Sequence, residues 1–293
     1  MIMPRQGEAF AVKVVTIATD LDNRFLQQIL VQSCRALELD LIILRSNKSP
    51  FRLADKRETL VEYLAQLPDR DELILFTDGY DALFIKGENH LVEAYGRFPQ
   101  PVIFSAEMNC WPLGVAGLAL HDTPPAGRYP YLNSGGYIGP AGVLHELLDR
   151  YPEAPSDRFE TLRRLRAHGY DTDRLFQWSD QYRWVLVQLL ETGTIGLDHD
   201  GQLFECYSPP APSLNFLEIR RSVEQFQAHG RESEAYQQER TRLVERLRVP
   251  SEAAHIHFAS PVTKAVALDL LDEGRWPDWL TAALPHAAHA ARP

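Results

Sequence analysis

Residues 73–84 read LILFTDGYDALF, an apolar run that carries two aspartates, Asp78 and Asp81. If a buried strand ends at Thr77, the turn after it can point both carboxylates at one spot. Adjacent carboxylates repel each other unless a cation lies between them, and oxygen ligands suit Mg²⁺ or Mn²⁺. Asp is also a common turn former and helix cap, so the pair by itself leaves a metal site and a purely structural role open.

Strand and helix patterns alternate on both sides of this run. Apolar, β-branched stretches predict four strands, at 10–19, 40–45, 72–77 and 101–107. Helical spacing of apolar residues predicts helices between them, at 25–37, 56–67 and 90–98. This alternation is typical of an α/β fold with a mainly parallel sheet and helices on its faces.

The pattern becomes less regular after the fourth predicted strand. Residues 108–139 are rich in Pro and Gly and are expected to be irregular. Further helices are predicted at 141–151, 179–193 and 220–248. Ser179 is placed as an N-cap, and residues 195–207 predict a strand pair across a turn at Asp200 and Gly201.

Composition excludes several classes of protein. The formal net charge is −10 and Lys and Arg form no run, which argues against a nucleic-acid binder. Three scattered cysteines, Cys34, Cys110 and Cys206, suggest neither a disulfide framework nor a zinc site. Lys13 breaks the first apolar run, so no signal peptide is expected, and no stretch approaches the ~20 apolar residues of a membrane span. We therefore expect a soluble, cytoplasmic protein, whose oligomeric state the sequence leaves open.

The segment YLNSGGYIG at 131–139 interrupts an apolar stretch with polar and small residues. Gly135 and Gly136 lack β-carbons, so the backbone there can approach another group closely, and Asn133 can donate and accept hydrogen bonds at once. A glycine-containing bulge or turn is the alternative, and the segment alone favours it.

A third segment, AHIHFASPVTK at 254–264, contains two histidines two positions apart. Strand alternation places His255 and His257 on the same face. An imidazole is an acceptable third ligand for Mn²⁺, and Lys264 is close enough in sequence to meet a phosphate. The alternative is that the histidines only pack at the edge of a sheet.

Five segments in order, FTDGYDALF, VIFSAEMNCWP, YLNSGGYIG, LDHDGQLFE and HFASPVTK, resemble the glycosyltransferase domain of the collagen lysyl hydroxylases and of the related collagen galactosyltransferases. The resemblance runs from about Val14 to Lys264. It implies a glycosyltransferase fold of the A type, a Rossmann-like mixed sheet that binds a UDP-sugar through a metal. It also implies one glycosyltransferase domain over 1–293, with a nucleotide-binding half at about 10–110 and an acceptor and metal-completing half at about 111–270.

The resemblance implies a role for each matching residue. Asp78, Asp81 and His257, rather than His255, would hold Mn²⁺, or else Mg²⁺. The nucleotide and its phosphates would be contacted by Thr16, Ile17, Ala18, Thr19, Lys56, Asp78, Gly79, Tyr80, Ser260 and Lys264. The sugar and the acceptor would be contacted by Trp111, Asn133, Ser134, Gly135, Gly136 and Asp180.

The segment SDQYRW departs from the family, which has an acidic run before the Gln. Here only Asp180 remains, after Ser179, and we expect Asp180 to be the general base, with Asn133 as the second catalytic residue. The late His-Gly-Asn-Gly of the family reads His257, Phe258, Ala259, Ser260, which leaves the diphosphate contacts open. Whether the reaction inverts or retains stereochemistry is also open.

These inferences predict a metal-dependent enzyme that transfers a hexose, galactose or glucose, from a UDP-sugar to a hydroxyl group. The alternative is a weak or inactive UDP-sugar-binding module of the same fold. A phosphatase with a strand-terminal aspartate pair is disfavoured, because such enzymes place the two aspartates two apart on the first strand. We expect an acceptor other than collagen, namely a glycan, a peptide or a small molecule, bound around Trp111, Asn133 and the segment 220–248.

Overall fold

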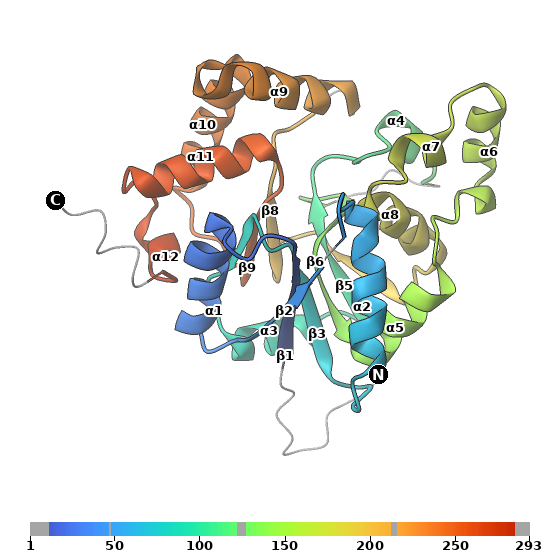
Figure 1. Cartoon of the computed structure of the whole chain (residues 1–293), viewed down its shortest axis with the longest axis horizontal. Helices are drawn as coiled ribbons and strands as arrows, with labels where there is room; N and C mark the ends of the chain where they lie inside the picture. The colour runs from blue at the N-terminus through green and yellow to red at the C-terminus, as the bar shows by residue number, and fades with distance from the viewer. Residues whose placement is uncertain (1–11, 47, 122–126, 212–215, 285–293) are drawn as a thin grey trace.

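The computed structural model describes residues 12–46, 48–121, 127–211 and 216–284, and its centre is a six-stranded sheet (Figure 1). In spatial order its strands are β2 (Asp40–Arg45), β1 (Val12–Ala18), β3 (Leu73–Thr77), β6 (Tyr131–Pro140), β5 (Val102–Glu107) and β7 (Ile195–Asp198). Strand β6 runs antiparallel to both of its neighbours, and the other five strands share one direction. The sheet is therefore mixed and mainly parallel.

A smaller sheet completes the strand framework. It consists of β4 (Ala82–Phe84), β9 (His255–Phe258) and β8 (Phe204–Tyr207), with β9 in the middle. Strand β9 pairs antiparallel with β4 and parallel with β8. Because β4 follows β3 after a short turn, the two sheets meet at residues 78–81.

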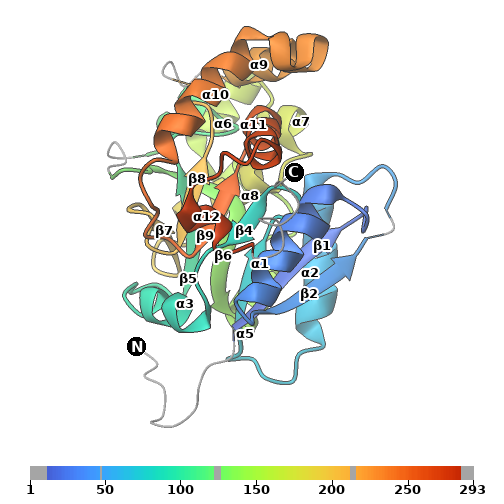
Figure 2. The same cartoon turned by 90° about the vertical axis from the view of Figure 1, so that its left-hand side faces the viewer.

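Helices cover both faces of the large sheet (Figures 1 and 2). Their bounds are α1 (Val31–Ala36), α2 (Lys56–Ala65), α3 (Glu88–Tyr95), α4 (Val115–Leu118), α5 (Ala141–Arg150), α6 (Glu160–Ala167), α7 (Thr172–Phe176), α8 (Asp180–Leu190), α9 (Phe216–His229), α10 (Glu234–Arg246), α11 (Pro261–Asp272) and α12 (Asp278–Thr281). Helices α2, α5 and α8 bury their apolar residues against one face, and α1 and α3 do so against the other. Helices α10, α11 and α12 pack on the small sheet in a third cluster.

Most of the predicted elements are confirmed, since apolar periodicity is a local property. Strand β2 and helix α8 keep the predicted positions, and Ser179 caps α8 by accepting a hydrogen bond from the amide of Tyr182. The charged segment 220–248 forms two helices, α9 and α10, because Ser233 caps a new helix after the turn at Gly230. The first predicted strand began at residue 10, and its first two residues lie outside the described part of the chain. A single domain over 1–293 stays a prediction.

Two predictions are wrong. Strands β7 and β8 both exist, but they belong to different sheets and do not pair with each other. The stretch expected to be irregular, 108–139, contains nine of the ten residues of strand β6, which lies near the middle of the large sheet. Its pairing with β5 shifts between Phe104 and Ser105, so the register jumps across Ser134–Gly136 and the expected bulge lies inside a strand.

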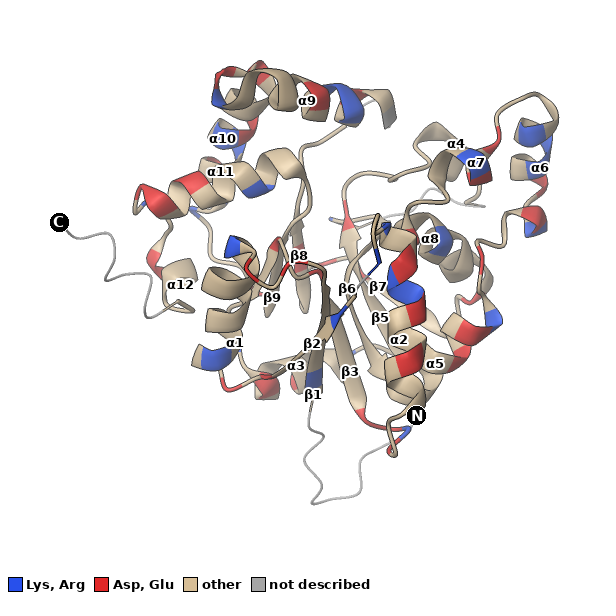
Figure 3. Ribbon diagram, viewed as in Figure 1, with Lys and Arg blue, Asp and Glu red and all other residues tan. Residues whose placement is uncertain are grey.

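Acidic and basic residues lie near one another along several helices (Figure 3). Helices α2 and α6 each carry acidic and basic residues. None of the helices in the described part of the chain is long and apolar enough to cross a bilayer.

The turn that separates β7 from β8 depends on one buried carboxylate. Asp198 accepts hydrogen bonds from the amides of Gln202, Leu203 and Phe204, at 2.9, 2.6 and 2.8 Å. Gly201 has a positive φ of 74°, which glycine adopts without strain. The carboxylate thus directs the chain from one sheet to the other.

We expect Asp198→Ala to lower the free energy of unfolding by about 3 kcal/mol, because it leaves buried amides without acceptors. Urea unfolding measures this loss. Asp200→Ala is the matched control, since Asp200 is exposed on the same turn and its truncation should cost less than about 0.5 kcal/mol. Equal losses in both variants would contradict this role for Asp198.

Candidate active site

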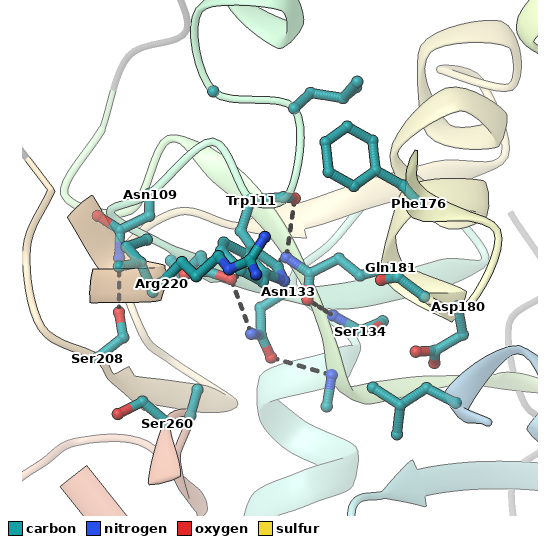
Figure 4. Close-up of a pocket in the computed structure, with 18 of the residues that line it drawn as sticks. Asn109, Trp111, Asn133, Ser134, Phe176, Asp180, Gln181, Ser208, Arg220 and Ser260 are labelled. Carbon is teal, nitrogen blue, oxygen red and sulfur yellow. Dashed lines mark hydrogen bonds between the residues drawn. The ribbon is translucent and has the colours of Figure 1, made fainter. Parts of the chain in front are cut away.

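One cavity of about 1190 Å³ lies beside the ends of β3, β5 and β6 (Figure 4). It is lined from the sheets by the turn after β3, by the end of β5, by β6 and by β9, and from the helices by the start of α2 and by parts of α4, α6, α7, α8, α9 and α11. Its volume exceeds the ~300–1,000 Å³ of an ordinary small-molecule pocket. The cavity therefore has room for two substrates.

Asp78, Asp81 and His257 come together at one point of this cavity. Each offers one ligand atom, and the three atoms lie within 4.8 Å of one another. His257 Nε2 lies 3.3 Å from Asp81 Oδ1 and 4.0 Å from Asp78 Oδ2. The turn between β3 and β4 supplies the aspartates, and β9, which pairs with β4, supplies the histidine.

The donor set fits a divalent cation. Asp81 Oδ1 is buried and has no hydrogen-bond partner among the described residues, so it is an acceptor that lacks a donor. Two carboxylates and one imidazole are ligands that Mn²⁺ and Mg²⁺ accept. These three residues could hold such an ion.

Gly135 explains why the histidine reaches this position. A β-carbon at residue 135 would lie 2.2 Å from His257 Cε1, and one at Gly136 would lie 2.9 Å from Phe204 and 3.2 Å from His255 Cε1. The two glycines of YLNSGGYIG therefore make room for side chains of the small sheet. The sequence indicated that another group can come close to the backbone at these glycines. At both positions that group is a side chain of the same chain.

Asn133 fixes the orientation of the His257 ring. Its Oδ1 accepts a hydrogen bond from the amide of Gly135 at 3.0 Å, and its Nδ2 donates to Glu107 Oε1 at 3.0 Å. Oδ1 is therefore also the acceptor for His257 Nδ1, 3.1 Å away. Because Nδ1 carries the hydrogen, the lone pair of Nε2 is directed toward Asp78 and Asp81.

The contacts of Asn133 favour a positioning role over the catalytic role expected for it. Both ends of its amide are engaged within the protein, and its side chain is buried. Glu107 accepts hydrogen bonds from Asn133 and from Gln181, the latter at 2.8 Å, and burial raises the pKa of Glu107. These contacts make Asn133 a positioning residue beside the cavity, and its catalytic role stays a prediction.

Lys56 connects the aspartate pair to the expected base. Its Nζ lies 2.6 Å from Asp78 Oδ1 and 3.4 Å from Asp180 Oδ2. Burial alone would lower the pKa of Lys56, but the carboxylates of Asp180 and Asp78 outweigh it and raise the pKa, so the lysine stays charged. Burial raises the pKa of Asp78. The charge of Lys56 lowers this pKa but offsets only part of the rise.

The two histidines of β9 have different surroundings. Burial opposes protonation of His257, yet Asp81 raises its pKa, whereas burial lowers the pKa of His255 to about 3. His255 lies with its Nε2 2.7 Å from Thr77 Oγ1, packed between Phe84 and Phe204. His255 is therefore a neutral core residue, outside the group of candidate ligands.

Six of the residues expected to contact the nucleotide and its phosphates lie outside the lining of the cavity. They are Thr16, Ile17, Ala18, Thr19, Gly79 and Tyr80. The hydroxyl of Tyr80 accepts hydrogen bonds from the amides of Thr19 and Asp20, at 2.8 and 2.7 Å, so it closes the end of β1. A β-carbon at Gly79 would meet Thr16 Oγ1 at 2.8 Å. The structure brings these residues to one another and not to the cavity.

The start of α11 forms another side of the cavity. Ser260 caps this helix by accepting hydrogen bonds from the amides of Val262 and Thr263, both at 3.1 Å. The N-terminus of a helix favours an anion, and Lys264 lies one turn further along and also lines the cavity. This end of the cavity suits a phosphate.

Sequence reasoning missed several lining residues. Glu107, Asn109 and Gln181 are buried polar residues at the cavity, and Figure 4 shows Gln181 hydrogen-bonded to Trp111 and Ser134, and Asn109 to Ser208. Gln181 Nε2 donates to the Trp111 carbonyl at 3.2 Å. Glu107 ends a fully buried strand, and this polar end of an apolar run was the signal available in the sequence.

A family model described as the PLOD GT domain matches residues 8–158. Two curated relatives are the chicken procollagen-lysine,2-oxoglutarate 5-dioxygenase 1, 27% identical over 169 residues, and the human multifunctional procollagen lysine hydroxylase and glycosyltransferase LH3, 27% identical over 149 residues. These matches cover 54% and 50% of this chain but only 19% and 17% of the relatives, so the chain spans about a fifth of their length or less.

Among solved structures, the apo form of mouse xyloside xylosyltransferase 1 aligns with a TM-score of 0.45 and 14% identity, over 84% of this chain and 97% of that one. The family match and the mixed, mainly parallel sheet agree with the expected A-type fold. The matched range contains Asp78, Asp81 and 131–139. Asp180 and His257 lie after its end, so their place in the site rests on the geometry above.

We expect Asn133→Ala to weaken Mn²⁺ binding by about 10-fold or more, because His257 loses the acceptor that orients it. Electron paramagnetic resonance of free Mn²⁺ measures the affinity directly, without turnover. Asn109→Ala is the matched control, since Asn109 is a buried asparagine of the same cavity whose amide contacts Ser208, Pro209 and Ala211. Unchanged Mn²⁺ affinity in Asn133→Ala would contradict the positioning role.

Proposed function

The chain belongs to the PLOD GT domain family, and on that premise we propose that it transfers a hexose, galactose or glucose, from a UDP-sugar to a hydroxyl-bearing acceptor with the help of Mn²⁺. The acceptor would be a glycan, a peptide or a small molecule. Membership of the family supports glycosyl transfer, whereas the donor, the sugar and the metal are inferences from the site.

One observation carries the proposal: a candidate cation site, a buried lysine and a buried aspartate lie together in a cavity large enough for two substrates. Lys56 is paired with both Asp78 and Asp180, and the carboxylate of Asp81 lies close by, which leaves an excess of negative charge. A divalent cation would offset this excess and allow a nucleotide diphosphate to bind. The start of α11, with Lys264, would face the phosphates from the other side.

A bound divalent ion would stabilise the charge that develops on the departing UDP, as a Lewis acid. Asp78, Asp81 and His257 would hold the ion, and Asn133 would keep the His257 ring in place. Lys56 holds Asp78 and Asp180 in fixed positions, which orients the acceptor side relative to the donor side.

Asp180 would accept the proton of the attacking hydroxyl group. It is buried at the first position of α8 and lines the cavity, and its contact with Lys56 at 3.4 Å holds its side chain in place. A carboxylate of this kind suits an inverting transfer. The binding-module alternative remains distinct, because it predicts UDP binding without turnover.

We expect Asp78→Ala and Asp81→Ala each to abolish Mn²⁺-dependent UDP binding, since each removes one of the candidate ligands. Isothermal titration of UDP with and without Mn²⁺ tests this. Asp149→Ala, an exposed aspartate on α5 outside the cavity, is the control and should bind UDP like the parent. If either Asp78→Ala or Asp81→Ala still binds UDP and Mn²⁺, the assignment of these aspartates as metal ligands is wrong.

We expect Asp180→Asn to lower turnover by about 100-fold or more and to leave UDP affinity within about 2-fold, because a general base acts mainly in the transition state. Release of UDP from UDP-galactose and UDP-glucose, with and without an acceptor library, measures turnover. If turnover is unchanged, Asp180 is not the base. If the parent binds UDP but releases none from either donor, the binding-module alternative holds.

A further inference from the structure

Exposed apolar side chains gather at the cavity on the side opposite α11. In the described part of the chain, ten large hydrophobic side chains are strongly exposed, and six of them line this cavity. We call five of the lining residues on this side the apolar wall: Val115, Leu165, Tyr170, Leu175 and Trp178. Clustered exposure of this kind marks a binding surface, because scattered apolar residues need no ligand but a contiguous patch does.

The apolar wall is continuous with the candidate catalytic groups. It is built from α4, α6, the connection between α6 and α7, α7 and the turn after α7, and only Ser179 separates Trp178 from Asp180. The ring of Trp178 lies 6.4 Å from the ring of Trp111, which also lines the cavity. Figure 4 shows Phe176, at the end of α7, on the same side of the cavity as Asp180. A molecule whose hydroxyl group reaches Asp180 therefore extends along the apolar wall.

The apolar wall offers few partners to a charged or highly hydroxylated ligand. The indole Nε1 of Trp178 already donates to the carbonyl of Leu175, at 2.9 Å. The arginines of α6 are paired with acidic neighbours: Arg163 and Arg164 with Glu160, and Arg166 with Asp173. Moving a polar group out of water without giving it a hydrogen-bond partner costs free energy, so this surface favours apolar atoms.

The cations that line the cavity lie elsewhere. Lys56 is bound to Asp78 and Asp180. Lys264 extends from α11, and Arg220 lies on α9. An anionic donor is thus attracted to the end with the candidate cation site. The apolar wall is left for the acceptor.

We propose that the acceptor carries an apolar group, a hydrophobic aglycone, next to the hydroxyl group that receives the sugar, and that this group lies on the apolar wall. The proposal adds the chemistry of the acceptor to the proposed function. It rests on that function for the assignment of this end of the cavity to the acceptor. Binding of the apolar group needs no turnover, so it can be measured separately.

The test compares methyl and phenyl β-glycosides of the same sugars, which differ only in the aglycone. Tryptophan fluorescence follows their binding with and without UDP and Mn²⁺. We expect each phenyl glycoside that binds to have a Kd at least about 10-fold lower than its methyl partner. Equal affinities of phenyl and methyl partners would overturn the proposal.

Leu175→Asp should remove this preference for phenyl glycosides, because it places a charge in the apolar wall. Leu190→Asp is the matched control: Leu190 is also a leucine at the surface, 38% exposed against 46% for Leu175, and it lies at the end of α8 outside the cavity. The control should keep the parent's preference. A preference that survives in Leu175→Asp would overturn the proposal.

Two further results separate the possible failures. Failure of the parent to bind UDP and Mn²⁺ would refute the proposed function. The preference for phenyl glycosides would still decide whether the apolar wall binds a ligand. Dimerisation of the parent that is abolished by Leu175→Asp, measured by sedimentation, would show that a second copy of the chain covers the apolar wall, and would also overturn the proposal.

Discussion

The site depends on the close approach of β6 to β9. The ring of His257 lies directly against the backbone of Gly135, where any β-carbon would collide with it, and the ring of Phe204 lies against Gly136 in the same way. This contact joins the large sheet to the small one, and it carries His257 to the aspartates that follow β3. A side chain at residue 135 would force the small sheet away, and the candidate cation site would open.

A second constraint is electrostatic. Burying Lys56 with Asp78 and Asp180 costs desolvation free energy that ion pairing returns only in part, so such a cluster is weak support for stability. Perturbed pKa values of buried groups in a cavity are more typical of functional sites. The buried Asn133–Glu107 pair is also better explained by the site than by stability. It orients the imidazole of His257 and gives the buried side-chain amide of Asn133 a hydrogen-bond partner.

The cavity combines two environments that suit different halves of a transfer reaction. Lysines, carboxylates and the start of α11 surround one end, and the apolar wall forms the other. The junction is Asp180, which belongs to the helix that begins directly after the apolar wall. In the proposed reaction, such a division would let a charged donor and a less polar acceptor bind side by side without competing for the same groups.

The sequence by itself determined the alternation of strands and helices, the turn that carries Asp78 and Asp81, the shared face of His255 and His257, and the cap at Ser179. These features depend on residues a few positions apart, whose periodicity and hydrogen bonding are local. From the resemblance it also identified the residues that meet as the candidate cation site.

Only the tertiary structure decided the rest, because it depends on contacts between residues that are distant in the chain. Asn133 acquires its role through His257, 124 residues away, and no local pattern contains that contact. The residues 131–139 form a strand because β3 and β5 pair with them on both sides, which overrides the low strand propensity of Asn and Gly. The buried carboxylate of Asp198 separates β7 from β8, and packing of α4, α6 and α7 beside one cavity creates the apolar wall.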